Sequence, residues 1–81
     1  MEQEYLIRCA PLAGAELSAM MRQFPSPISR PQMHEIYNYR IDPDGYYLVD
    51  RGVDPRVSAV ALKLFIDAAL SKGPSVEILR P

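Results

Sequence analysis

The chain has 81 residues, 48% of them hydrophobic, which suits one small globular domain. Nine basic residues nearly balance ten acidic ones, which argues against electrostatic binding to nucleic acid or to an anionic membrane. The single cysteine excludes an internal disulfide, and the single histidine excludes a zinc site of the Cys/His type. Stability must therefore come from regular packing, from oligomerisation, or from both.

The first half of the chain predicts a strand, a helix and a stiff connection. Alternating hydrophobic residues indicate a strand over residues 4–9. A helix over roughly residues 13–24 follows, because apolar residues recur at helical spacing: Leu17, Met20, Met21 and Phe24. Three prolines between residues 25 and 31 cannot continue this helix and favour an extended crossover. A second interpretation of this segment is a proline-rich peptide ligand.

Residues 35–41 and 46–51 predict a hairpin joined by Asp42-Pro43-Asp44-Gly45. Pro43 presets the first central turn position and Gly45 accepts a positive φ, which favours a type I turn with a glycine bulge. The expected pairs on one face are Ile41–Tyr46, Tyr39–Leu48 and Tyr37–Asp50. Those on the other face are Arg40–Tyr47, Asn38–Val49 and Ile36–Arg51. We place the first, more apolar face against the helices. A two-residue turn in place of the bulged turn is expected to flip the pairing and exchange the two faces.

A second helix is predicted to start at Pro55, with Asp54 as its N-cap, and to end before Gly73-Pro74. Its apolar face consists of Val57, Val60, Ala61, Leu64 and Ala68. Further apolar residues leave only a narrow polar stripe, so this helix should contact the sheet and also the first helix or another subunit. Residues 75–80 then predict the last strand.

This order of elements predicts an α+β fold of the ferredoxin-like βαββαβ type over residues 1–81, as a single domain. Right-handed crossovers give a four-stranded antiparallel sheet in the order 4-1-3-2, with two helices on one face. A meander with the helices set apart ranks second, because it would leave the apolar second helix uncovered.

The exposed sheet face is the best candidate site, because the predicted register surrounds an apolar centre with arginines. The face comprises Leu6, Arg8, Ile36, Asn38, Arg40, Tyr47, Val49, Arg51, Glu77 and Leu79. The expected partner contacts are Leu6, Arg8, Arg40, Tyr47, Val49, Arg51 and Leu79. Of these, Tyr47 and Arg40 are the expected anchors. The alternative is an ordinary sheet with one solvent-exposed face, whose large residues are present only because they favour strands.

No pattern in the chain predicts catalysis, a metal site or a cofactor. Cys9 is expected on the buried face of its strand, where a thiol behaves as a small hydrophobic group. His34 precedes an edge strand that is not adjacent to the first strand, so a thiol–imidazole pair is not expected. Asp42 and Asp44 are accounted for by the turn. We therefore expect no enzyme activity.

These features favour a small cytoplasmic protein-binding module of the regulatory, inhibitor or immunity type, acting through its exposed sheet face. The first residues lack the basic region and apolar core of a secretion signal, and no apolar stretch is long enough to span a bilayer. A second reading is a homodimer packed sheet face on sheet face around a small-ligand pocket, with an enzyme as one form of it.

A third reading is nucleic-acid binding through the sheet. Residues 45–49, Gly-Tyr-Tyr-Leu-Val, are similar to the glycine-aromatic core of a signature in RNA-recognition modules, which stack bases on sheet aromatics. This sequence has Asp44 where a basic residue is usual, and Leu48 and Arg51 where aromatics are usual. The predicted register also turns Tyr46 inward. These departures argue against a nucleic-acid partner.

Overall fold

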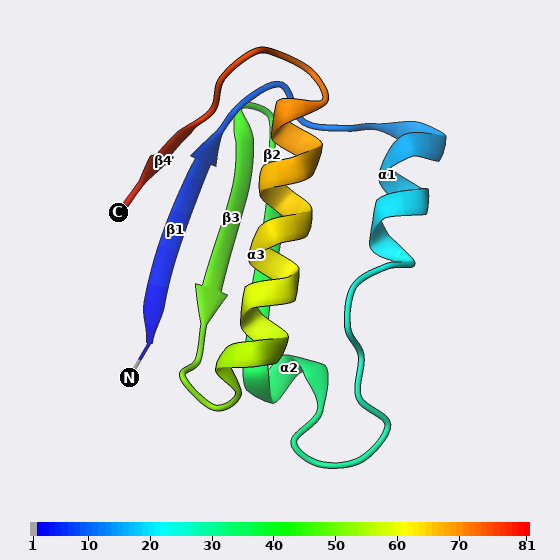
Figure 1. Ribbon diagram of the computed structural model, residues 1–81, viewed down its shortest axis with the longest axis vertical. Coiled ribbons are helices and arrows are strands. Elements are labelled where there is room, and N and C mark those ends of the chain that lie inside the picture. Colours follow the sequence, from blue (N-terminus) through cyan, green and yellow to red (C-terminus); the bar gives the residue numbers. More distant parts are fainter. Residues whose placement is uncertain (1) are drawn as a thin grey trace.

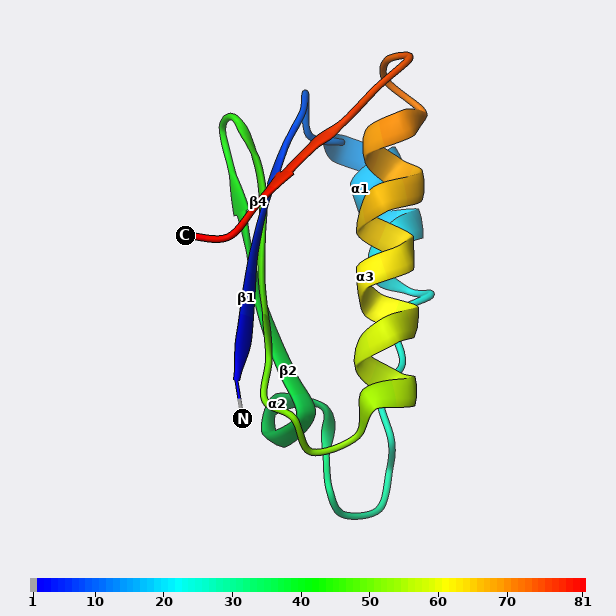
Figure 2. The same ribbon diagram turned by 60° about the vertical axis from the view of Figure 1, so that its left-hand side comes forward.

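The computed structural model describes residues 2–81, in which four strands form one antiparallel sheet in the order β2-β3-β1-β4. This is the predicted strand order. The strands are β1 (Gln3–Arg8), β2 (Tyr37–Asp42), β3 (Gly45–Asp50) and β4 (Glu77–Leu79). The helices are α1 (Gly14–Met21), α2 (Met33–Ile36) and α3 (Pro55–Leu70) (Figure 1). The chain is therefore α+β, and α1 and α3 lie on the same face of the sheet (Figure 2). No helix within residues 2–81 has the length and apolar character needed to cross a membrane.

The β2–β3 hairpin has the predicted register but not the predicted bulge. Its pairs run without interruption from Tyr37–Asp50 to Asp42–Gly45. Gly45 has a φ of 147° and still pairs directly with Asp42, so the ladder needs no extra residue. The two faces of the sheet are therefore those that the sequence predicted. The expectation that a two-residue turn would exchange them is wrong, because Asp42 pairs with Gly45 across Pro43-Asp44 and the other predicted pairs are kept.

The core lies between the sheet and α3. Tyr37, Tyr46 and Leu48, all on the helix-facing side of the sheet, are at most 1% exposed. Phe65 of α3 meets the Tyr46 ring at a centroid distance of 4.8 Å and meets Phe24 edge-to-face at 4.9 Å. Aromatic rings thus meet at the centre of this small core, and such pairs stabilise it beyond their buried area.

Helix α3 begins as predicted, because the Asp54 carboxylate accepts hydrogen bonds from the N–H groups of Arg56 and Val57. Its buried residues are Ser58, Ala61, Phe65, Ala68 and Ala69. The prediction that Val60 belongs to the packed face is wrong, since this side chain is 48% exposed. The helix turns its small alanines and Phe65 toward the sheet. Because both of its flanks are apolar, hydrophobic spacing alone did not select that side.

Helix α2 replaces the start of the predicted second strand. The Gln32 N–H donates to the Glu35 carboxylate at 2.9 Å, and the Gln32 side chain accepts in return, which forms a capping box. Ile36 was predicted on the exposed sheet face, but it lies in α2 and is 1% exposed. Helix α1 is also shorter than predicted: it ends at Met21, and Phe24 is buried beyond it.

Candidate functional site

One row of side chains crosses the outer face of the sheet, the face turned away from the helices. Arg40 pairs with Tyr47, Tyr47 with Leu6, and Leu6 with Leu79. We call these four residues the cross-strand row. It takes one residue from each strand and joins four of the seven predicted contact residues. Arg40 is exposed, whereas Leu6, Tyr47 and Leu79 are half-buried.

Arg40 is held flat against the sheet by two partners. Its guanidinium carbon lies 4.7 Å from the centroid of the Tyr47 ring, which is a cation–π contact. Its Nε and Nη2 atoms donate to the Asp42 carboxylate at 2.7 and 3.1 Å. These hydrogen bonds are the chief reason why the pKa of Asp42 is lowered and the pKa of Arg40 is raised. The charged head of Arg40 is thereby fixed beside the aromatic ring.

The other two predicted arginines are also paired with carboxylates. Arg51 donates from Nε to Asn38 Oδ1 at 2.7 Å and forms an ion pair with Glu2. The Arg8 Nε atom lies 3.9 Å from a carboxylate oxygen of Glu77. Every arginine of the predicted site therefore has an acidic neighbour on the same face. A nucleic-acid phosphate would have to displace these carboxylates, which argues against binding through this surface.

Tyr47 is also anchored at its hydroxyl. The hydroxyl donates to the carboxylate of Glu4, and this hydrogen bond is the main reason why the pKa of Tyr47 is raised. The ring is therefore fixed at one face by Arg40 and at its tip by Glu4. Such a ring has little side-chain freedom left to lose when a partner binds.

Val49 lies on the outer face but offers little surface, because it is 6% exposed. Its cross-strand neighbours are Asn38 and Glu4. These neighbours bond to Arg51 and Tyr47, so hydrogen-bonded pairs lie on both sides of the valine. Val49 therefore supports the outer face from beneath and offers little surface of its own.

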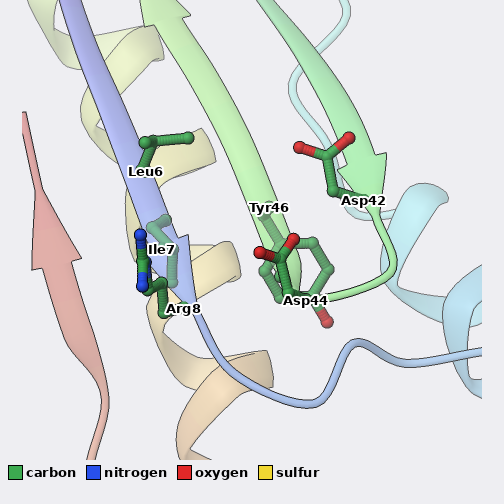
Figure 3. Close-up of a pocket in the computed structure, with 7 residues that line it drawn as sticks. Leu6, Ile7, Arg8, Asp42, Asp44 and Tyr46 are labelled. Carbon is green, nitrogen blue, oxygen red and sulfur yellow. The ribbon is translucent and has the colours of Figure 1, made fainter. Parts of the chain in front are cut away.

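A shallow pocket of about 100 Å³ lies at the end of this face next to the β2–β3 turn (Figure 3). Leu6 and Arg8 of β1 line it together with Asp42 and Asp44 from the hairpin. Figure 3 shows Ile7 and Tyr46 behind their strands, on the helix side. Small-molecule sites usually enclose about 300–1,000 Å³. This pocket is therefore smaller than a usual small-molecule site.

Two acidic residues that hold the cross-strand row, Glu4 and Asp42, were not among the predicted site residues. Glu4 alternates with Leu6 on β1, so the period of two that placed Leu6 could have placed it as well. Asp42 was assigned to the turn alone, but its side chain accepts a hydrogen bond from Arg40. The signal for Asp42 was its spacing, because Arg40 and Asp42 are two residues apart on one strand and so lie on the same face.

The thiol and the imidazole lie apart. Cys9 follows β1 and is half-buried against the core, and this burial raises its pKa. His34 lies on α2, at the opposite end of the sheet (Figure 1). Within residues 2–81, no group of three or more Cys, His, Asp and Glu side chains is arranged to hold a metal ion.

Comparison of the chain with protein-family models, with curated proteins and with solved structures found no match. Its function therefore has to be argued from its own surface.

Proposed function

We propose that this chain is a ferredoxin-like α+β domain that binds another protein through the outer face of its sheet. The observation that carries the proposal is the cross-strand row, in which Arg40 lies over Tyr47 beside the apolar side chains of Leu6 and Leu79. An apolar centre with tyrosine and arginine anchors is the usual composition of a protein interface. The role would be regulatory, inhibitory or of the immunity type, in the cytoplasm. A lone free thiol at Cys9 suits that reducing compartment.

The geometry of the row supports a protein partner for two reasons. Its two expected anchors are already fixed by Asp42 and Glu4, so binding would cost little side-chain entropy. Its rim also carries both signs of charge, with Arg8 and Glu77 at one corner and Arg51 at another. A mixed rim selects a partner by charge complementarity and contributes more to specificity than to affinity.

The test is affinity capture from the cells that produce the protein, with the double variant Arg40→Ala/Tyr47→Ala and quantitative mass spectrometry. Loss of two anchors should reduce recovery of the true partner by about 30-fold, as expected for a loss of about 2 kcal/mol. The matched control is Arg56→Ala/Leu70→Ala, which removes an exposed arginine and a 45%-exposed apolar side chain from α3. It should capture like the unmodified chain.

Far-ultraviolet circular dichroism and the melting temperature establish that both variants are folded. If the proteins retained by the control are retained equally by Arg40→Ala/Tyr47→Ala, the outer face is not the binding surface.

A further inference from the structure

The two edges of the sheet are built differently. The β2 edge is six residues long and carries neither a proline nor a bulge. The Ile36 carbonyl accepts from the Arg51 N–H, so even-numbered residues direct their backbone groups toward β3, while Tyr39 and Ile41 direct theirs to the open side. Among residues 2–81, no segment on that open side bonds to the backbone of these two residues. Such an edge is a ready template for another strand.

The helix layer is displaced toward this β2 edge. Helix α3 packs on β3 and β1. Figure 1 shows α1 beyond β2, and Figure 2 shows it in the same layer as α3. Helix α1 therefore overhangs the space that a fifth strand beside β2 would occupy. At the opposite edge, β4 lacks such cover: Ile78 is on its helix side, opposite Ile7, yet is 43% exposed.

We propose that copies of this chain associate head to tail, with β4 of one copy adding to β2 of the next beneath the overhanging α1. Within the sheet β2 and β4 run antiparallel to each other, so the added strand continues the antiparallel pattern with the same face outward. The two edges are complementary, because α1 overhangs the open side of β2 and can cover the exposed Ile78 of an added β4.

Backbone alternation and charge select one register. The Cys9 N–H donates to the Asp44 carbonyl, so even-numbered residues of β1 face β4, and Ile78 directs its backbone groups to the open edge. Pairing Ile78 with Tyr39 then sets two half-buried residues, Val76 and Ile41, opposite each other on the helix side. On the outer side the same register sets Glu77 opposite Arg40, which favours it electrostatically.

The neighbouring registers are less favourable. Pairing Ile78 with Ile41 would set Glu77 opposite Asp42, two like charges. Pairing it with Tyr37 would carry Leu79 to Ile36, where the strand has given way to helix α2.

Helix α1 supplies an apolar roof for the added strand. Glu16, Ala19 and Met20 line a groove of about 370 Å³ between α1 and α3. At 3.6 residues per turn, Leu17 and Met21 lie on the flank of α1 that faces away from α3. Both are half-buried against the core of their own chain, and the surface that they leave exposed would cover Ile78 of the neighbouring copy. A two-fold β2–β2 pairing would place two α1 helices above the same two strands, whereas the head-to-tail pairing places only one there.

The test is the mass in solution of the full chain, by sedimentation velocity over a concentration series. Head-to-tail association has no built-in stop, so the mass of the unmodified chain should rise with concentration past that of a dimer. Ile78→Lys should remain monomeric, because it places a charge beneath the roof. It leaves the cross-strand row intact, and the monomer tolerates it because Ile78 is exposed. The matched control is Ile28→Lys, at a side chain that is 98% exposed in a connecting loop, and it should assemble like the unmodified chain.

Charge reversal tests the register. Arg40→Glu and Glu77→Arg should each weaken association by about tenfold, and the double variant Arg40→Glu/Glu77→Arg should restore it. The proposal is overturned by an unmodified chain that is monomeric throughout, or by one that stops at a dimer, as a sheet-face dimer would. Assembly of Ile78→Lys like the unmodified chain, or no recovery in the double charge reversal, overturns it too.

Discussion

Two buried tyrosine hydroxyls tie the sheet to the segments on either side of α1. The Tyr46 oxygen accepts a hydrogen bond from the Leu12 N–H at 2.8 Å, ahead of the helix. The Tyr37 hydroxyl donates to the Pro25 carbonyl at 2.9 Å, beyond its end. Residues that fill the core with their rings therefore also fix the position of the overhanging helix with their polar tips.

The Tyr46→Phe variant should destabilise the protein by about 1–3 kcal/mol, because the buried Leu12 N–H loses its acceptor. Urea unfolding measures this loss. Tyr47→Phe is the matched control: its hydroxyl bonds to Glu4 on the outer face, so the change should stay within about 0.5 kcal/mol. Equal losses in the two variants would mean that the Leu12 bond does not contribute to stability.

At the scale of elements, the start of β3 depends on one glycine. Gly45 has a φ of 147°, and a Cβ atom there would lie 1.9 Å from the carbonyl oxygen of Ile7. β1 approaches β3 this closely only because Gly45 has no side chain. The turn and the central strand pair are thus joined at this position.

Gly45→Ala should cost about 3 kcal/mol or more, since backbone strain and a clash with main-chain atoms both oppose folding. Guanidinium unfolding followed by circular dichroism gives the free energy. Gly73→Ala provides the comparison, because a Cβ atom at Gly73 would meet nothing within 4 Å, and its effect should stay within about 1 kcal/mol. A Gly45→Ala variant as stable as Gly73→Ala would contradict this role of Gly45.

The elements that the sequence predicted well are those governed by local rules. The face assignment of the hairpin follows from alternation, although its turn lacks the predicted bulge, and the start of α3 follows from Asp54 and Pro55. Helix α2 was missed because its capping box, Gln32 to Glu35, lies directly after a run of prolines that favours extended backbone.

Burial within the candidate site was harder to predict than its membership. Alternation alone placed Leu6, Tyr47 and Leu79 on one face. The burial of Val49 depends on hydrogen bonds between side chains from different strands, which strand periodicity does not report. The exposure of Val60 is likewise a tertiary effect, since only the packed sheet decides which apolar side of α3 is covered.

For the whole molecule, stability should fall in alkali. The pKa of Tyr37 is raised to about 12, chiefly by burial and secondly by nearby Tyr39. An unfolded tyrosine ionises near pH 10. The contribution of Tyr37 is therefore complete below about pH 10 and is lost as the pH rises toward 12.

Tyr37→Phe should flatten the fall in unfolding free energy between pH 10 and 12, as measured by urea titrations across that interval. Some slope should remain, because burial also raises the pKa of Tyr46. Identical slopes in the variant and the unmodified chain would show that Tyr37 does not ionise differently on unfolding.

The strand order also determines how long β1 exists during synthesis before its neighbouring strands are made. β1 lies between β3 and β4, so neither of its neighbours exists when it is made. Ile7 pairs with Tyr46 and with Ile78. At about 5–20 residues per second, roughly 40 residues separate β1 from β3, a delay of about 2–8 s. During that delay the strand that becomes central in the folded sheet has both of its edges open on the ribosome. Chaperones that bind extended apolar segments therefore have their best opportunity at β1.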